Sequence, residues 1–145
     1  MGCKLINAMC PRYNSSKIVS RSNVFNLPIK KGVAYVGSIF NYSTMLYDFQ
    51  SRFYAIRCAF SIFRHLQRDL GCLTITKLYE VFYHVHVNDL VKDADGIARM
   101  AGIAPDEPFD YHSDTARLVC KAWAKYETNV ALADEDVQLA QKAIL

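Results

Sequence analysis

The sequence predicts a mainly α-helical fold, a compact domain of four to five helices preceded by an extended basic N-terminal segment. Three observations support this prediction. Apolar residues after about position 43 recur mostly at three- and four-residue steps, which is the period of an α-helix. Residues that favour helix ends, such as Gly71, Gly102, Ser113 and Asn129, lie where these runs begin or stop. A chain of 145 residues that is 52% hydrophobic and 21% charged has the size and composition of one folded domain.

Residues 1–32 are predicted to form a basic arm or transit-like segment, followed by a single helical domain over residues 33–145. The chain has a net charge of +3, but residues 1–47 contain six basic residues and no acidic one. Pro11, Pro28 and the Asn14-Ser15-Ser16 run are typical of an extended or weakly helical chain. This segment could be an organelle transit peptide, an arm ordered by the rest of a complex, or a feature of a viral protein.

The first part of the domain contains one ambiguous run and one long predicted helix. The run from Gly32 to Phe40 is compatible with a strand or with the start of a helix. Residues 43–69 show helical spacing, and Gly71 follows as a residue that tolerates the left-handed end of a helix. The apolar positions of this predicted helix are Leu46, Phe49, Phe53, Ile56, Phe60, Phe63 and Leu66.

A second helix is predicted from Thr74, with an alternative for its last part. Its apolar face would contain Leu78, Val81, Phe82 and Val85, although residues 81–87 also alternate as a strand would. A short helix over residues 96–101 is expected next, capped by one of two aspartates and ended by a glycine; these residues are Asp93, Asp95 and Gly102. An acidic linker with two prolines then leads to residue 113.

Two further helices are predicted at the end of the sequence. Ser113 is a favourable N-cap for a helix that continues to about Glu127, with Asn129 after it. Its expected buried face is Leu118, Val119, Ala122, Trp123 and Tyr126. The last helix begins near the acidic run 134–136, which favours the positive end of a helix dipole, and it buries Val137, Ala140 and Ile144.

Residues 114–145 resemble a small helical unit found in the lids of AAA+ ATPases and in histone folds. The resemblance lies in a helix, a short link and a second helix that starts with Glu135-Asp136-Val137, with Ala133 in place of the usual Thr. The sequence contains no G-x-x-x-x-G-K-[ST] phosphate-binding loop, so this resemblance implies no ATPase activity.

The long helix is predicted to carry a basic stripe opposite an aromatic one. Arg57, Arg64 and Arg68 are separated by seven and four residues, which returns each side chain to nearly the same helical angle. Such a stripe suits anionic lipid head groups, an RNA backbone or an acidic protein, or it is an ordinary solvated face. The aromatic residues Phe53, Phe60 and Phe63 would pack the domain or a neighbouring subunit. A second stripe, Arg117, Lys121 and Lys125, is more typical of a solvated surface.

The sequence contains one pair of histidines that resembles a metal site. On a strand, His84 and His86 would point to the same face, whereas on a helix they would be too far apart to chelate. A third ligand would have to come from elsewhere in the fold. Ordinary polar or core histidines are the simpler interpretation, and we expect no bound metal and no cofactor.

No catalytic motif is visible in the sequence. The five cysteines are an odd number without a C-x-x-C pair, which favours free thiols in a reducing compartment. There is no G-x-S-x-G nucleophile motif, and no apolar run is long enough for a membrane span. The sequence therefore predicts a protein that is not an enzyme.

The leading hypothesis is a non-catalytic helical subunit of a larger mitochondrial protein assembly, associated with the inner membrane through its surface. It would bind other subunits through aromatic residues, and anionic lipid head groups or acidic neighbours through its arginine stripe. One alternative is a ribosomal or viral protein that binds nucleic acid, located in the cytoplasm or in a virus. The other is a small metal-dependent enzyme that uses His84 and His86.

Overall fold

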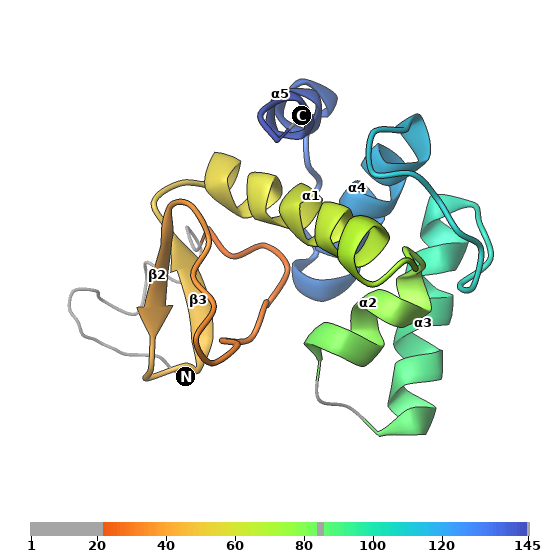
Figure 1. Ribbon diagram of the computed structural model, residues 1–145, viewed down its shortest axis with the longest axis horizontal. Coiled ribbons are helices and arrows are strands. Elements are labelled where there is room, and N and C mark those ends of the chain that lie inside the picture. The colour runs from red at the N-terminus through yellow and green to blue at the C-terminus, as the bar shows by residue number, and fades with distance from the viewer. Residues whose placement is uncertain (1–21, 84–85, 145) are drawn as a thin grey trace. The chain divides into compact units, whose positions relative to one another are not determined.

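The computed structural model describes residues 22–83 and 86–144 (Figure 1). Within these ranges it contains five helices and one two-stranded sheet, so the prediction of a mainly α-helical protein is confirmed. The chain divides into two compact units, unit 1 over Met1–Ala55 and unit 2 over Ile56–Leu145. This division differs from the one predicted after residue 32.

Unit 1 contains an antiparallel hairpin of β2 (Ser38–Asn41) and β3 (Leu46–Phe49). The turn between the strands is an Asx-type turn, because the Asn41 side-chain oxygen accepts from the backbone N–H groups of Ser43 and Thr44 at 3.1 and 3.4 Å. Met45 has a φ of 59°, which completes the reversal of the chain before β3 begins.

The predicted start of the long helix at residue 43 is wrong, since residues 46–49 form β3 and the helix begins at Arg52. In β3 the burial alternates, with Tyr47 and Phe49 buried and their neighbours partly exposed. A short strand that precedes a helix can mimic helical spacing, because Leu46, Phe49 and Phe53 stand three and four residues apart in either conformation. The predicted run from Gly32 to Phe40 ends within β2, so its last residues adopt the strand, which is one of the two predicted alternatives.

The described part of the predicted arm, residues 22–32, is packed within unit 1. Asn23 is buried, and its amide nitrogen donates to the carbonyl oxygens of Leu27 and Tyr47 at 3.1 and 2.6 Å. The Tyr47 hydroxyl in turn donates to the Val33 carbonyl at 2.6 Å. These bonds hold the segment along the side of β3 that β2 does not occupy. Residues 1–21 of the predicted arm lie outside the described residues.

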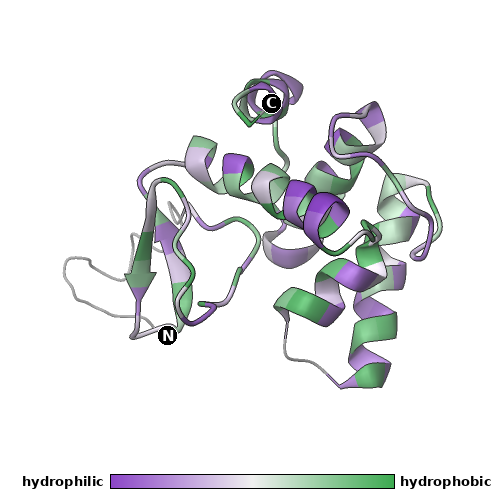
Figure 2. Ribbon diagram, in the orientation of Figure 1, coloured by the Kyte–Doolittle hydropathy of each residue, from purple (hydrophilic) through white to green (hydrophobic). Residues whose placement is uncertain are grey.

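Unit 2 is built from helices, of which the first begins in unit 1. The helices are α1 (Arg52–Asp69), α2 (Ile75–Phe82), α3 (Val87–Ala101), α4 (Asp114–Thr128) and α5 (Asp134–Lys142). Helix α3 packs against both α2 and α4, and α4 also contacts α5. Along α1, hydrophilic and hydrophobic residues recur in bands (Figure 2). Its buried positions in unit 2 include Ile56, Ala59, Ile62 and Leu66.

Several helix ends predicted from the sequence are confirmed. The Thr74 hydroxyl accepts from the Lys77 N–H at 3.0 Å, and the Ser113 hydroxyl accepts from the Ala116 N–H at 3.1 Å, so both residues act as N-caps. Gly102 and Asn129 end α3 and α4 in the left-handed conformation, with φ values of 81° and 60°. These local signals place the boundaries of the helices close to where the sequence predicts them.

The prediction of a short helix over residues 96–101 is wrong at its start, because α3 begins nine residues earlier, at Val87. Asp93 and Asp95 therefore lie inside the helix and cap nothing. Asp93 instead accepts a hydrogen bond from the Tyr126 hydroxyl of α4 at 2.5 Å. Gly96 permits this close approach, since a Cβ there would lie 2.5 Å from a ring carbon of Tyr126.

The centre of unit 2 is aromatic. The Phe63 ring of α1 lies 5.9 Å from Trp123 of α4 and 5.4 Å from Phe109, which precedes α4. Trp123 is fully buried, as predicted, but Leu118 is 51% exposed and does not belong to the buried face of α4. Val137, Ala140 and Ile144 are buried as expected.

Candidate functional site

The three arginines of the predicted basic stripe lie in different surroundings. Arg64 is partly buried, and its Nη1 donates to the Ile144 carbonyl at 2.6 Å, so it binds the carboxyl end of the last helix. Arg68 is exposed, with its guanidinium 5.3 Å from the centre of the Tyr111 ring, a cation–π contact. Arg57 is partly exposed. Two members of the stripe thus contact other parts of unit 2, and the binding of an anionic partner stays a prediction.

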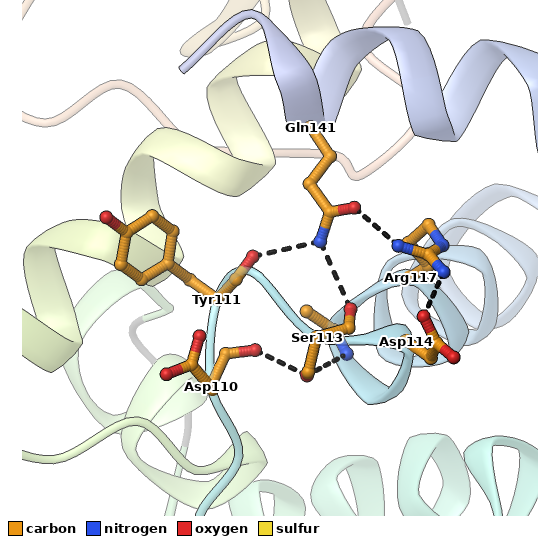
Figure 3. Close-up of polar contacts among 7 residues, drawn as sticks. Asp110, Tyr111, Ser113, Asp114, Arg117 and Gln141 are labelled. Carbon is orange, nitrogen blue, oxygen red and sulfur yellow. Dashed lines mark hydrogen bonds and ion pairs between the residues drawn. The ribbon is translucent and has the colours of Figure 1, made fainter. Parts of the chain in front are cut away.

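A buried amide, that of Gln141, connects α5 to the start of α4 (Figure 3). The Gln141 side-chain nitrogen donates to the carbonyl oxygens of Tyr111 and Ser113 at 3.0 and 3.1 Å. Its oxygen accepts from Arg117 at 2.7 Å, and Arg117 also pairs with Asp114. This network uses polar groups to fix one helix on another, while the buried Tyr111 hydroxyl has no hydrogen-bond partner in the described chain.

Two of the three phenylalanines predicted as interface residues are core residues. Phe60 and Phe63 are fully buried, and their rings meet edge to face at 5.6 Å. Phe60 and Phe63 therefore pack the domain, which is one of the two predicted alternatives, and they are not interface residues. Phe53 is exposed and packs edge to face on Tyr54. The helical spacing that placed all three on one stripe could not distinguish an inward from an outward position.

A cluster of tyrosines and carboxylates joins α2, α3 and α4. The Tyr79 hydroxyl donates to Glu127, the Trp123 indole N–H donates to the Tyr83 hydroxyl at 2.8 Å, and the two tyrosine rings stack at 4.2 Å. Burial, followed by neighbouring charge, raises the pKa of Tyr79 and of Tyr83 well above the usual range. The hydrogen bond to Asp93 raises the pKa of Tyr126 to about 12. These phenols stay protonated at neutral pH and act as hydrogen-bond donors rather than as bases.

The histidines and cysteines form no visible reactive centre within residues 22–83 and 86–144. His84 lies outside the described residues, so the predicted pair with His86 stays untested, and His86 itself is exposed at the start of α3. In the described ranges no group of three or more metal-binding side chains gathers. Burial raises the pKa of the Cys58 and Cys120 thiols, which is typical of inert core cysteines.

Two members of the second basic stripe, Arg117 and Lys121, line a groove between α4 and α5 with a volume of about 260 Å³. Lys121 forms an ion pair with Asp134, and this hydrogen bond lowers the pKa of the aspartate. Arg117 pairs with Asp114, as described above. Because the cations at the rim are paired with acids of the same unit, the groove shows little preference for an anion.

The most unusual surface of the described chain is on the hairpin of unit 1. Four apolar or aromatic side chains there are more than half exposed: Val36, Ile39 (51%), Tyr42 (68%) and Met45 (57%). The Phe40 ring stacks on Tyr42 at 5.9 Å, and the middle of β2 is hydrophobic in Figure 2. We call this set, with Phe40, the hairpin surface. The sequence signal for it is the absence of any charged residue between Lys31 and Asp48.

Comparison with known proteins gives no relative from which a role could be transferred. No family model matches the chain, and no curated protein matches it. The helices of the described chain include none with the length and apolar character needed to cross a membrane.

Proposed function

We propose that this chain is a non-catalytic subunit of a larger protein assembly and that it binds a different protein through the hairpin surface. The observation that carries the proposal is the exposure of Val36, Ile39, Tyr42 and Met45 within or beside one short hairpin, where they occupy both faces of the sheet. Exposed apolar residues are ordinary when scattered, but several together mark an interaction site in many proteins. Aromatic and methionine side chains are also enriched in protein interfaces.

Charge supports a partner that is acidic and argues against a second copy of the same chain. The acid-free segment 1–47 carries six basic residues and includes the whole hairpin surface. Two copies that met through this region would bring like charges together, which is unfavourable. A partner with acidic residues around an apolar centre would be attracted instead.

The chemistry of the buried groups supports a role without catalysis. Cys58 and Cys120 are held as neutral thiols by burial, and the phenols of Tyr79 and Tyr83 are held protonated. Catalytic groups usually have pKa values shifted toward the working pH, whereas these shifts lead away from it.

The test is affinity purification of the tagged full-length protein from its own cells, followed by reconstitution with the purified partner. Ile39→Asp/Tyr42→Asp is the test variant, because it places charge in the hairpin surface at exposed positions. Met100→Asp/Leu139→Asp is the matched control, since it adds the same charge at two exposed apolar positions of unit 2.

We expect one defined partner that binds the purified wild type and the control variant equally, and the hairpin variant at least tenfold more weakly. Circular dichroism should show all three proteins equally folded. A protein that stays monomeric and whose co-purifying set is the same for all three forms would contradict the proposal.

A further inference from the structure

We propose that the partner adds an extended acidic segment as a third strand along the outer edge of β2. This inference rests on the proposed function and specifies how the hairpin surface would bind. It follows from the direction of the backbone hydrogen bonds in the hairpin, from the composition of β2 and from the charge around it.

The register of the hairpin shows which backbone groups face outward from β2. The Gln50 N–H donates to the Gly37 carbonyl at 2.9 Å, and Gly37 lies opposite Gln50 in the continued register. In an antiparallel ladder, hydrogen-bonded pairs alternate with pairs that are not bonded. Ile39 and Asn41 therefore bond to β3, whereas the N–H and C=O of Phe40 point away from it.

The far side of β3 agrees with this assignment. The Tyr47 N–H, opposite Phe40, donates to the Leu27 carbonyl at 3.1 Å, away from β2. The Ile29 N–H donates to the Met45 carbonyl at 3.0 Å on the same side. The outer edge of β3 is thus covered by residues 27–29. Among the described residues no strand covers the outer edge of β2, although the outward N–H of Ser38 already donates to the Tyr35 carbonyl at 2.9 Å.

The edge of β2 is short, at four residues, but it lacks the other features that usually prevent strand addition. Natural edge strands are protected by lysines, prolines, inward-pointing charges or bulges. The sequence of β2 is Ser-Ile-Phe-Asn, which contains none of these residues, and the register shows no bulge. An added strand would find the exposed Ile39 on one face of the sheet and Phe40 stacked on Tyr42 on the other.

The chemistry of the occupant follows from the charge of the surrounding chain. In the described part of unit 1, Lys30, Lys31 and Arg52 outnumber the one acid, Asp48, which lies opposite Ile39 in β3. An added segment that alternates apolar residues with Asp or Glu would therefore be favoured over a basic one.

The experiment measures the binding of synthetic peptides to the full-length protein by fluorescence anisotropy. The probe is a fluorescein-labelled peptide of about eight residues that alternates Val or Ile with Asp or Glu. One control peptide replaces each acidic residue with Lys. The other is N-methylated at its central peptide groups, which removes the N–H donors that a third strand would need.

Two protein variants separate the backbone from the side chain of Phe40. Phe40→Ala removes the aromatic ring and keeps the outward N–H, whereas Phe40→Pro removes the ring and the N–H. Proline is tolerated at an edge strand position whose N–H faces solvent. Hydrogen exchange of the Phe40 amide, measured with and without the peptide, reports strand addition directly. The peptide controls keep the test decisive if the proline variant does not fold.

We expect the acidic peptide to bind at least tenfold more tightly than either control peptide, to protect the Phe40 amide, and to bind Phe40→Pro more weakly than Phe40→Ala. Equal binding of all three peptides, or no binding of the acidic one, would overturn strand addition. Strand addition can fail while the proposed function holds. This would be shown if the peptides fail the test and the purified partner still binds the Ile39→Asp/Tyr42→Asp variant more weakly than the wild type. A wild-type dimer in light scattering that Phe40→Pro dissociates would identify a second copy as the occupant and would also overturn this inference.

Discussion

Gln141 shows how single residues hold the helices of unit 2 together. It is a buried polar residue, and its amide satisfies two backbone carbonyls before α4 while it accepts from Arg117 (Figure 3). Buried polar groups are tolerated when all their partners are present, and losing one side of such a network leaves the other side unsatisfied. The position of α5 on α4 therefore depends on this amide.

Replacing this amide tests its contribution to stability. We expect Gln141→Met to lower the free energy of unfolding by about 2 to 3 kcal/mol, because it leaves the Tyr111 and Ser113 carbonyls without a donor. The measurement is urea unfolding followed by circular dichroism. Gln138→Met is the control, since Gln138 is exposed on the same helix, and it should change stability by less than about 0.5 kcal/mol. Equal effects of the two substitutions would contradict this role.

At the scale of elements, α2 and α4 are joined by hydrogen bonds whose donors are tyrosine and tryptophan side chains. Tyr79 reaches Glu127 from one helix, and Trp123 reaches Tyr83 from the other. The phenols have a raised pKa in the folded protein, while in the unfolded chain they ionise near pH 10. The folded state thus holds these protons more tightly than the unfolded state does.

This difference predicts a loss of stability at alkaline pH. A raised folded-state pKa contributes stability that is complete below the unfolded pKa, and the contribution is lost as pH rises from about 10 toward the folded value. We expect the free energy of unfolding to fall above about pH 10, and to fall less steeply in Tyr79→Phe, which has one titrating phenol fewer.

The measurement is a series of urea unfolding curves between about pH 8 and pH 11.5, compared with Tyr42→Phe as the control. Tyr42 is largely exposed, so its removal should leave the alkaline slope unchanged. The slopes of wild type and Tyr79→Phe would coincide if the buried phenol did not couple folding to pH.

The elements also show where sequence patterns were informative. The caps at Thr74, Ser113, Gly102 and Asn129 were predictable because each depends on a residue and its immediate backbone. The start of α3 was not predictable, because Asp93 and Gly96 serve a contact with Tyr126 that is distant in sequence. The hairpin was missed because β3 is followed closely by α1, and their apolar residues together mimic one helix.

At the scale of the whole molecule, the charges are divided unevenly along the sequence. All fourteen acidic residues follow position 47, and every charged residue within 1–47 is basic. The hairpin surface belongs to the basic part, whereas buried aromatic residues occur in both units. This distribution supports the proposal that unit 1 provides the binding surface.

The same asymmetry underlies the prediction of a mitochondrial location. We expect the full-length protein to be imported by isolated mitochondria and protected from added protease when the membrane potential is intact. Arg12→Gln/Lys17→Gln/Arg21→Gln should reduce import severalfold, because transit segments depend on their positive charge. Lys92→Gln/Lys121→Gln/Lys125→Gln removes the same charge from unit 2 and is the control. Protease sensitivity of the wild type, or a purely cytosolic protein on fractionation, would contradict this location.

The sequence by itself determined the helical class, most helix ends and the separation of basic from acidic segments, because these depend on composition and on neighbouring residues. The tertiary structure decided which face of each element is buried. Phe60 and Phe63 turned out to be core residues, Arg64 and Arg68 contact other parts of unit 2, and the apolar side chains of the hairpin remain exposed. Periodicity shows that a stripe exists, but only long-range packing determines whether it faces the protein or its surroundings.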